Sequence, residues 1–349
     1  MKTRLTEMVG IKVPILLSGM SWISTPKMVA AVSNAGGLGI LATGPLNSSQ
    51  TREAIREIRK LTDKPFGANA SLMFPGAAEN AKVLLKEQVP VINFALGKGD
   101  WIVREAHKYG GKVFATVVNL KHAKRAQDFG TDAVIATGQE AAAHGEDVTS
   151  LVLIPHLAEN LQIPVIGAGG FADGRGLAAA LALGADGISM GSRFMVVRES
   201  LVHDNFKKLC MEATEQDTLY DNVFDGMDGR VLKTKEAQAM MKRGFPVVEA
   251  FKGALLIKKL MNLSFAKFAA VSIEMLRAEE GHPLMVLARQ AVGNMKHLKA
   301  LNDGDVEGGI LFAGQCCGGI TDNPTTKELI DRVIREAEEA LAKLNACRK

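Results

Sequence analysis

The stretch from residue 164 to residue 194 reads PVIGAGGFADGRGLAAALALGADGISMGSRF and decides the fold. Short apolar runs at its two ends have the composition of buried strands, and the part between them places leucine and alanine at helical spacing. Glycine follows each run at once, as Gly169-Gly170 after the first and as Gly191 after the second. The stretch therefore predicts a parallel strand, helix, strand unit in which each strand ends in a tight turn.

The same alternation fills the chain from its beginning to this stretch. Eight short apolar runs are candidate strands, at residues 14–17, 39–42, 66–69, 91–94, 113–116, 133–136, 164–167 and 187–190. Helical patterns lie between them, as at 25–34, 49–61 and 173–183. Several end in glycine, where a left-handed C-cap is expected, at Gly36-Gly37, Gly110-Gly111, Gly130 and Gly184. Eight such units within 194 residues predict an α/β protein with a closed (β/α)8 TIM barrel.

A change of rhythm after strand eight predicts a second region. Residues 201–303 contain long helical stretches, such as 265–280, and few candidate strands. We expect a helical lid there, inserted after strand eight and laid over the substrate site. The barrel then comprises residues 1–200 and 304–349, and the amphipathic pattern at 325–344 predicts a helix that closes its wall.

The composition excludes several classes of protein. The net charge of +4 comes from 42 basic and 38 acidic residues interleaved along the chain, whereas a nucleic-acid binder concentrates its basic residues on one face. The four cysteines form no CxxC pair and have no histidine cluster beside them, so neither a metal site nor a disulfide scaffold is predicted. No run reaches the roughly 18 apolar residues of a membrane-spanning helix. We therefore expect a cytoplasmic protein that binds neither nucleic acid nor membrane.

Glycine turns mark a candidate phosphate site. Barrels of this kind commonly bind phosphate at the loops after strands seven and eight, and this sequence has glycine turns in both loops. Glycine lets main-chain N–H groups approach phosphate oxygens, and the following helix adds a favourable dipole. We therefore predict a phosphate group at the turns formed by Ala168, Gly169, Gly170, Gly191 and Ser192.

Two charged residues beside these turns have other expected roles. Arg193 either pairs with the phosphate or braces the barrel wall. Asp173 is expected to cap the helix after strand seven.

Residues 166–194 resemble the nitronate monooxygenase (formerly 2-nitropropane dioxygenase) family. That family includes FMN-dependent NADH:quinone reductases and FMN-type enoyl-ACP reductases. The resemblance extends to four further motifs, Ser18-Gly19-Met20, AVSNAGGLG at 31–39, FGAN at 66–69 and Ala313-Gly-Gln315. It implies an oxidoreductase with FMN as its cofactor, whose phosphate occupies the glycine turns.

The resemblance also indicates which residues approach the flavin. It places Gly19 and Met20 after strand one, Asn69 after strand three and Gln315 of the closing glycine segment beside the cofactor. Amide groups there can tune the redox balance of the flavin edge, and Met20 can supply an apolar floor. Two threonines are expected at the cofactor as well, Thr116 and Thr137.

The loop after strand six carries the expected catalytic residue, His144. The family typically has a Gly-x-Glu-x-Gly-Gly-His pattern in this loop, with the histidine facing the flavin, and this chain reads GQEAAAH at 138–144. A histidine there can remove a carbon-bound proton or stabilise an anionic substrate. Ala142 and Ala143 replace the usual glycines, so we expect the loop to be less able to adopt positive φ.

The expected activity is that of a nitronate monooxygenase, in which an alkyl nitronate reduces FMN and dioxygen completes the oxidation. The alternative is an NAD(P)H:quinone reductase, because the short segment after His144 resembles that branch, although Thr116 stands where the branch can have a lysine. Enoyl-ACP reduction is less favoured because no basic patch for an acidic carrier protein is evident. A phosphate-binding barrel without redox chemistry is the alternative from another class. The oligomeric state and the choice between NADH and NADPH stay open.

Overall fold

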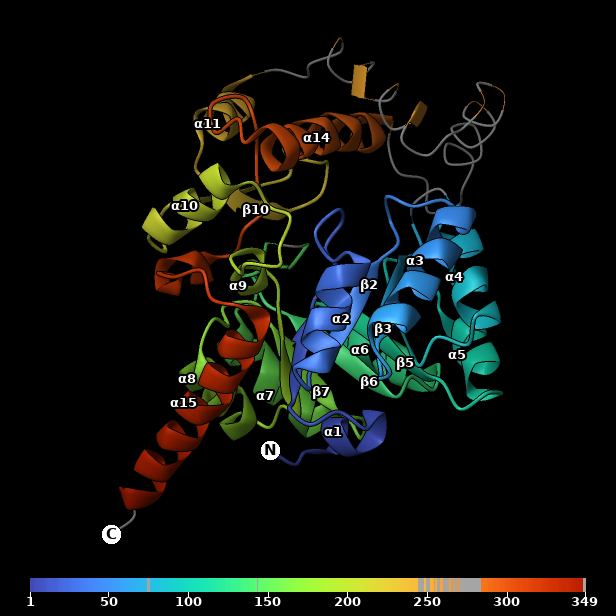
Figure 1. Cartoon of the computed structure of the whole chain (residues 1–349), viewed down its shortest axis with the longest axis vertical. Coiled ribbons are helices and arrows are strands. Elements are labelled where there is room, and N and C mark those ends of the chain that lie inside the picture. Colours follow the sequence, from blue (N-terminus) through green and yellow to red (C-terminus); the bar gives the residue numbers. More distant parts are fainter. Residues whose placement is uncertain are drawn as a thin grey trace.

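The structure is a computed structural model that describes residues 1–73, 76–142, 144–243 and 284–347, together with single residues between 248 and 269. Eight parallel strands close into a barrel in the order of the sequence, and β8 pairs with β1 (Figure 1). Their bounds are Ile15–Leu17 (β1), Leu38–Ala42 (β2), Gly67–Ser71 (β3), Val91–Ala95 (β4), Lys112–Val117 (β5), Ala133–Thr137 (β6), Val165–Ala168 (β7) and Gly187–Met190 (β8). Each strand lies within two residues of its predicted position. The predicted (β/α)8 TIM barrel is therefore confirmed.

Helices cover the outside of the barrel between consecutive strands (Figure 1). They are Pro26–Asn34 (α2), Ser48–Leu61 (α3), Ala77–Lys86 (α4), Asp100–His107 (α5), Leu120–Asp128 (α6), Ser150–Asn160 (α7) and Gly174–Ala182 (α8). Asp173 caps α8 as predicted, because its Oδ1 accepts a hydrogen bond of 3.0 Å from Gly176 N. Glycines with positive φ follow four of the wall helices, as the sequence predicted, at Gly36, Gly110, Gly130 and Gly184. A short helix before β1, Arg4–Val9 (α1), lies at the opposite end of the barrel from residues 204–242 and 284–303 (Figure 1).

Side chains of the strands alternate between the barrel interior and the layer beneath the helices. In β6, Ile135 belongs to the interior cluster, whereas its neighbours Val134 and Ala136 pack beneath the helices. The same period of two carries polar residues inward at the carboxyl ends of the strands. These polar inward positions are Ser18, Asn69, Asn93, Thr116, Thr137 and Ser189, and Ala168 is an apolar member of the same layer. The carboxyl end of the barrel is therefore lined largely by hydroxyl and amide groups.

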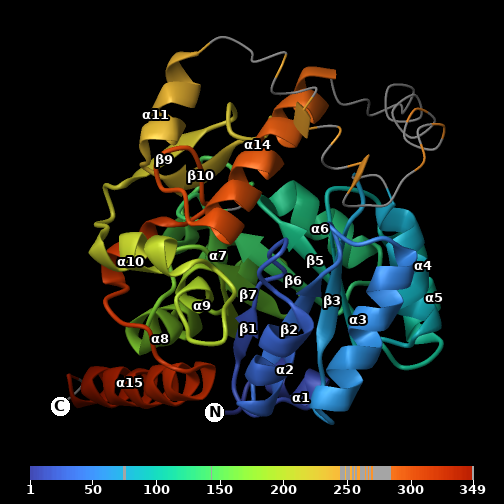
Figure 2. The same ribbon diagram turned by 45° about the horizontal axis from the view of Figure 1, so that its top comes forward.

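The chain departs from the barrel pattern after β8, and we name residues 201–303 the insertion. Its described elements are Asp204–Glu212 (α10), Thr218–Asp221 (β9), Gly229–Leu232 (β10), Lys235–Lys242 (α11) and Leu284–Asp303 (α14). Figure 2 shows them gathered at one end of the barrel, away from α1 and the N-terminus. A 3-10 turn, Gln315–Gly319 (η1), follows the insertion and returns the chain to the barrel.

The insertion contains one element that sequence reasoning missed, an antiparallel pair of strands. β9 and β10 each have four residues, and Val231 of β10 also forms an isolated bridge with Phe312. Strands this short give too little alternation to stand out from the surrounding helical patterns. The helical stretch expected at 265–280 lies outside the described residues. The division into barrel and lid stays a prediction.

The helix that completes the barrel wall comes from beyond the insertion. α15 (Thr326–Ala346) packs against α8 and α2, close to the predicted position of 325–344. Its approach to α8 is tight, because a Cβ on Gly174 would lie 2.3 Å from Val333 O. The helix that directly follows β8, Ser192–Met195 (α9), has only four residues. α15 therefore takes the place of the eighth wall helix.

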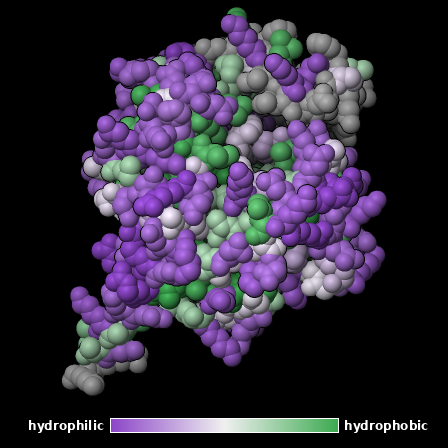
Figure 3. All heavy atoms as spheres, in the orientation of Figure 1, coloured by the Kyte–Doolittle hydropathy of each residue, from purple (hydrophilic) through white to green (hydrophobic). Residues whose placement is uncertain are grey.

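The junction between the insertion and the barrel has an apolar core of its own. In Figure 3, hydrophilic atoms cover most of the visible face, and apolar atoms gather where the two regions meet. The buried cluster at the junction includes Ile23, Val196, Phe206, Leu232, Leu301, Leu311 and Cys317. Among the helices of the described residues, none is both long and apolar enough to cross a membrane.

Candidate active site

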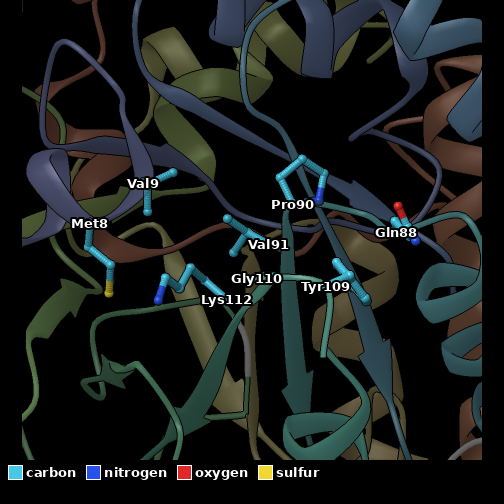
Figure 4. Close-up of a pocket in the computed structure, with 9 residues that line it drawn as sticks. Met8, Val9, Gln88, Pro90, Val91, Tyr109, Gly110 and Lys112 are labelled. Atoms are coloured by element: carbon cyan, nitrogen blue, oxygen red, sulfur yellow. The ribbon is translucent and has the colours of Figure 1, made fainter. Parts of the chain in front are cut away.

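The pocket in Figure 4 lies at the amino ends of β4 and β5, beside α1. It has a volume of about 280 Å³, and the one ammonium group on its wall, that of Lys112, pairs with Asp132 at 3.1 Å. In TIM barrels the amino end contributes stability, whereas the chemistry takes place at the carboxyl ends of the strands. The candidate active site is accordingly at the other end, where the polar strand ends face the insertion.

The turn after β7 is built on two glycines in the left-handed region, Gly169 with φ +100° and Gly170 with φ +82°. Its carbonyl oxygens face the protein, since the Ser150 hydroxyl lies 3.1 Å from Ala168 O and 2.9 Å from Gly169 O. Ser150 is fixed by Glu140, whose carboxylate accepts from Ser150 N at 2.9 Å. The N–H and C=O groups of a trans peptide point in opposite directions. The N–H groups of both glycines therefore point away from Ser150.

The turn after β8 lies beside the first, because β7 and β8 pair along their length. A Cβ on Gly191 would lie 3.4 Å from Met20 Sδ, so the loop after β1 reaches the same turn. Ser192 is buried, and its hydroxyl accepts a hydrogen bond of 2.8 Å from Gly314 N. Three segments that are distant in sequence thus meet at the mouth of β7 and β8.

Four main-chain N–H groups of these two turns have no hydrogen-bond partner within the described part of the chain, those of Gly169, Gly170, Gly191 and Ser192. Gly169 and Gly191 are half-buried and Ser192 is buried, and main-chain donors at such positions are normally paired, whereas Gly170 is exposed. Phosphate oxygens are the acceptors that glycine turns of this kind bind. The donor set therefore fits the phosphate of FMN, in the place where the sequence predicted it.

Arg193 braces the barrel wall, the second of its two expected roles. The guanidinium is almost fully buried, and its Nη2 lies 2.7 Å from Asp322 Oδ1. Nη1 donates to the carbonyl oxygens of Val196 and Asp322. Burial lowers the pKa of Arg193, and the carboxylate of Asp322 opposes that shift. Arg193, which follows the glycine turn after β8, thus anchors the segment that leads into α15.

Asn69 joins the loops that follow β1 and β2. Its Oδ1 accepts from Thr43 N at 3.1 Å, and its Nδ2 donates to Gly19 O at 3.0 Å. The contact is close, because a Cβ on Gly19 would lie 2.6 Å from Asn69 Nδ2. The structure therefore brings together two residues that the resemblance places at the flavin.

The two predicted threonines occupy the same inward layer. Thr116 on β5 shares a hydrogen bond with Asn93 on β4, whose Nδ2 lies 3.1 Å from Thr116 Oγ1. Thr137 is buried at the end of β6 and pairs in register with Ala168 on β7. At position 116, where the quinone-reductase branch can have a lysine, this chain therefore has a neutral hydroxyl. That hydroxyl, of Thr116, is hydrogen-bonded to the amide of Asn93.

Gln315 lies where the closing glycine segment meets the loop after β6. Its main-chain N donates to Glu140 O at 2.9 Å, and a Cβ on the preceding Gly314 would lie 2.6 Å from the same oxygen. Glu140 also holds Ser150 beneath the first phosphate turn. One carboxylate and its main chain thus connect the glycine segment, the loop after β6 and the phosphate turn.

His144 faces the insertion. Its Nδ1 lies 3.1 Å from Asp228 O, and its Nε2 lies 3.4 Å from Asp225 Oδ2. Asp225 is buried, which raises the pKa of its carboxyl group, and the nearby imidazole opposes that shift. Ala142 does not adopt positive φ, and Ala143 lies outside the described residues. At Ala142 the loop therefore does not use the left-handed conformation that a glycine would favour.

Two residues that the sequence analysis did not single out hold this loop against the hairpin of β9 and β10. Arg230 donates from its main chain to Ala142 O at 3.0 Å and from Nη2 to Gln139 O at 3.1 Å. Tyr220 donates to Gly145 O at 2.7 Å, and the Arg230 guanidinium stacks over its ring at 5.1 Å. Burial lowers the pKa of Arg230. An arginine inside the apolar run of β10 was the only sequence signal for this role.

Three aromatic rings form a second contact between the insertion and the barrel rim. The ring of His297 on α14 lies 5.9 Å from that of Trp22 in the loop after β1, and 5.6 Å from that of Phe312. His297 is buried, and the loss of hydration lowers its pKa to about 4. It is therefore a neutral ring at physiological pH. Trp22 has a φ of +61°, which is rare for a bulky residue and places its ring against the insertion.

Three of the four cysteines are at least partly buried, and Cys347 is exposed. Cys210 and Cys317 are buried in the junction core, and burial raises the pKa of the Cys316 thiol to about 12. A thiol with a raised pKa is a poor nucleophile and a poor metal ligand at neutral pH. Within the described ranges, no group of three or more histidine, cysteine, aspartate or glutamate side chains is arranged to hold a metal ion.

Comparison with known proteins covers the whole chain. The family model described as "Nitronate monooxygenase" matches residues 2–83 and 77–336. The chain is 35% identical over 351 residues to the "(3aS,4S,5R,7aS)-5-hydroxy-7a-methyl-1-oxo-octahydro-1H-indene-4-carboxyl-CoA dehydrogenase" of Rhodococcus jostii (strain RHA1), with 100% of this chain and 99% of the relative covered. It is 28% identical over 285 residues to a "Probable nitronate monooxygenase" of Staphylococcus aureus (strain MSSA476), with 68% of this chain and 80% of the relative covered.

A solved structure agrees with these matches. FabK from Thermotoga maritima superposes with a TM-score of 0.81 and 35% sequence identity, and 99% of each chain is covered. The similarity includes the insertion as well as the barrel. On these grounds the chain belongs to the nitronate monooxygenase family, whose members are oxidoreductases.

Proposed function

We propose that this oxidoreductase binds FMN, with the phosphate on the turns after β7 and β8. The observation that carries the proposal is the set of four N–H groups, at Gly169, Gly170, Gly191 and Ser192, that lack a partner in the described chain. When bound, FMN supplies the hydride-accepting and hydride-donating centre of the reaction. The inward layer of amide and hydroxyl groups would hold its ring.

The chain's own residues have separate tasks in this proposal. Asn69 fixes the loops after β1 and β2, so that Gly19 and Met20 stay at the rim. Gln315 and Glu140 close the loop after β6 against the phosphate turn. His144 moves a proton between the substrate and the protein, because it is a titratable side chain on the catalytic rim of the barrel.

For the substrate class we favour a thioester of coenzyme A. The relative that matches this chain over its full length is named as a carboxyl-CoA dehydrogenase, whereas the "Probable nitronate monooxygenase" matches 68% of the chain at lower identity. The full-length match includes the insertion, which faces the candidate site. The proposed reaction is the interconversion of a C–C bond and a C=C bond conjugated to the thioester.

The second candidate is the activity expected from the sequence, oxidation of an alkyl nitronate with dioxygen. It is favoured by the family model, which is named for that activity and spans nearly the whole chain. Quinone reduction by NAD(P)H uses the same cofactor site and is an outcome of the same experiment.

The test compares these reactions on one preparation of FMN-loaded enzyme under anaerobic conditions, in a stopped-flow spectrophotometer. Enzyme reduced by NADH or NADPH is mixed with crotonyl-CoA, with cyclohex-1-enecarboxyl-CoA or with a quinone, and oxidised enzyme is mixed with propionate-3-nitronate. Reoxidation by either thioester supports the favoured class. Bleaching by the nitronate, or reoxidation by the quinone alone, replaces it with the corresponding alternative. A protein that stays colourless after incubation with excess FMN refutes the flavin assignment.

A further inference from the structure

Both ring nitrogens of His144 face oxygen acceptors that belong to the insertion. Nδ1 lies 3.1 Å from the carbonyl oxygen of Asp228, which can only accept, and Nε2 lies 3.4 Å from Asp225 Oδ2. A neutral imidazole carries one N–H and one lone pair. If Nδ1 donates its N–H to the carbonyl of Asp228, the lone pair of Nε2 faces a carboxylate oxygen of Asp225. These two atoms repel each other unless a proton lies between them. The contact is therefore one in which His144 and Asp225 can share a proton.

Asp225 is held in place by the main chain around it. Its Oδ1 accepts from Met227 N at 3.2 Å, and only 7% of the residue is exposed. The loop that carries it packs tightly on α14, because a Cβ on Gly293 would lie 2.1 Å from Phe224 O and a Cβ on Gly226 would lie 2.8 Å from Val286 Cα. The carboxyl group is therefore a fixed partner of His144.

The other charged groups near the ring are cations with partners of their own and exposed carboxylates. The Arg230 guanidinium donates to Gln139 O and Thr218 Oγ1, and the Tyr220 hydroxyl donates to Gly145 O. Three exposed carboxylates lie in the two loops around His144, at Glu146, Asp147 and Asp228. On α14, Arg289 donates a hydrogen bond to Asn222 Oδ1. The local charge beside the imidazole is thus mainly negative.

We propose that Asp225 is the positioning residue of His144, and that the proton held between them is delivered to the substrate. The proposal rests on the proposed function. Addition of hydride from reduced FMN to the β-carbon of a conjugated thioester breaks the C=C π bond and leaves an electron pair on the enolate. The proton of the pair then bonds to the α-carbon, and the protein is left with neutral His144 and the Asp225 carboxylate. The substrate gains one hydride and one proton, and solvent restores the proton of the pair.

The role can be tested without removing the loop from the insertion. Three contacts other than the pair hold the two segments together, from Arg230 N to Ala142 O, from Arg230 Nη2 to Gln139 O and from Tyr220 OH to Gly145 O. Asp225→Asn keeps the shape of the side chain and an acceptor for Met227 N. The matched control is Asp147→Asn, which makes the same charge change at an exposed position three residues from His144.

The first measurement is independent of any substrate. The FMN-loaded protein is labelled with 15N-histidine, and the His144 ring signals are assigned by their loss in His144→Gln. In the wild type and in Asp147→Asn at pH 7, we expect both ring nitrogens to show the chemical shifts of protonated or proton-sharing nitrogen. In Asp225→Asn, one of them should move to the shift of a nitrogen with a free lone pair. Identical spectra in all three proteins overturn the pairing.

The second measurement is the reduction of the two thioesters in the steady state. A positioned proton donor contributes roughly 10²- to 10⁴-fold to a rate. We expect Asp225→Asn to lose about 10- to 100-fold of kcat with little change in KM, Asp225→Glu to recover part of the loss and Asp147→Asn to behave as wild type. An unchanged kcat in Asp225→Asn overturns the proposed role. A wild-type enzyme that shows the paired ring and reduces neither thioester keeps the pairing and refutes the substrate class.

Discussion

The glycine turns after β7 and β8, where we propose that phosphate binds, lie at the same end of the barrel as the loop after β6. The two regions differ in whether their polar groups have partners within the protein. The turns after β7 and β8 present main-chain N–H groups that find no acceptor in the described chain. The loop after β6 has its polar groups paired with the insertion, through His144, Gly145, Ala142 and Gln139.

The two regions are suited to different tasks in one site, the binding of a ligand and the placement of a reactive side chain. Unpaired main-chain donors are complementary to a ligand that the protein does not itself supply. Paired side chains are complementary to another part of the same protein, so that the reactive group is placed by the insertion. The proposed cofactor site is thus set by local backbone geometry, and the proposed proton-transfer site depends on a contact between segments about 80 residues apart.

The largest effect is expected from His144→Asn, which removes the imidazole from the loop after β6. A general acid or base contributes roughly 10²- to 10⁴-fold. We expect kcat to fall by at least about 100-fold while the affinity for FMN stays unchanged, as measured by turnover and by quenching of flavin fluorescence. The control is His122→Asn, at an exposed position on α6. Full turnover of the His144 variant would remove this residue from the mechanism.

Gly169→Ala tests the turn after β7, whose main-chain N–H groups have no partner in the described chain. The residue has a φ of +100°, and an added Cβ would lie 3.0 Å from Gly138 O and 3.1 Å from Ser150 Oγ. A strained backbone of this kind costs about 1 to 3 kcal/mol. We expect the Kd for FMN to rise by about 10- to 100-fold in a fluorescence titration.

The matched control for that variant is Gly110→Ala, at the other end of the barrel. Gly110 also has positive φ, and an added Cβ there would meet nothing within 4 Å. It should lose stability without losing affinity for FMN. Equal losses of FMN affinity in the two variants would contradict the assignment of the phosphate site.

Arg230→Met breaks the attachment of the loop after β6 without touching the histidine. The variant loses two side-chain hydrogen bonds from a buried cation, to Gln139 O and Thr218 Oγ1. Hydrogen bonds of charged groups contribute about 1.5 to 3 kcal/mol each. We expect the free energy of unfolding, from urea denaturation, to fall by roughly 3 kcal/mol. Lys233→Met, at an exposed position just after β10, should change it little.

His297 differs from His144 in charge environment, because it is a buried histidine with no carboxylate partner among the described residues. Its pKa is lowered to about 4, so the unfolded chain binds a proton between pH 6.5 and about 4 that the folded protein does not. Stability is therefore lost as the pH falls through this window, by about 2 kcal/mol between pH 7 and pH 5. In His297→Phe this part of the pH dependence should disappear from urea denaturation curves. A slope equal to that of the wild type would show that another group titrates.

The sequence was sufficient for the barrel and for the glycine turns after β7 and β8, because both depend on neighbouring residues. Apolar runs, helical spacing and glycines at strand ends are local signals, and the structure has each predicted strand within two residues of its place. The inward layer with Asn69, Thr116 and Thr137 follows from the period of two once the strands are known.

The partners of the loop after β6 could not be predicted in the same way. Asp225, Tyr220 and Arg230 lie on or between two strands of four residues, whose pattern is too short to be recognised. A carboxylate at the end of a turn is most often exposed, and nothing near Asp225 in the sequence indicates that it is buried against a histidine. The family resemblance identified His144 but not the group that holds it.

The position of α15 has a consequence for how the protein is made. The last wall helix of the barrel leaves the ribosome only after the entire insertion has been synthesised. Until then the sides of α2 and α8 that α15 contacts have no cover, so the nascent chain carries an open seam. A ribosome that stalls within the insertion therefore releases a barrel with one uncovered side, a natural target for chaperones and proteases.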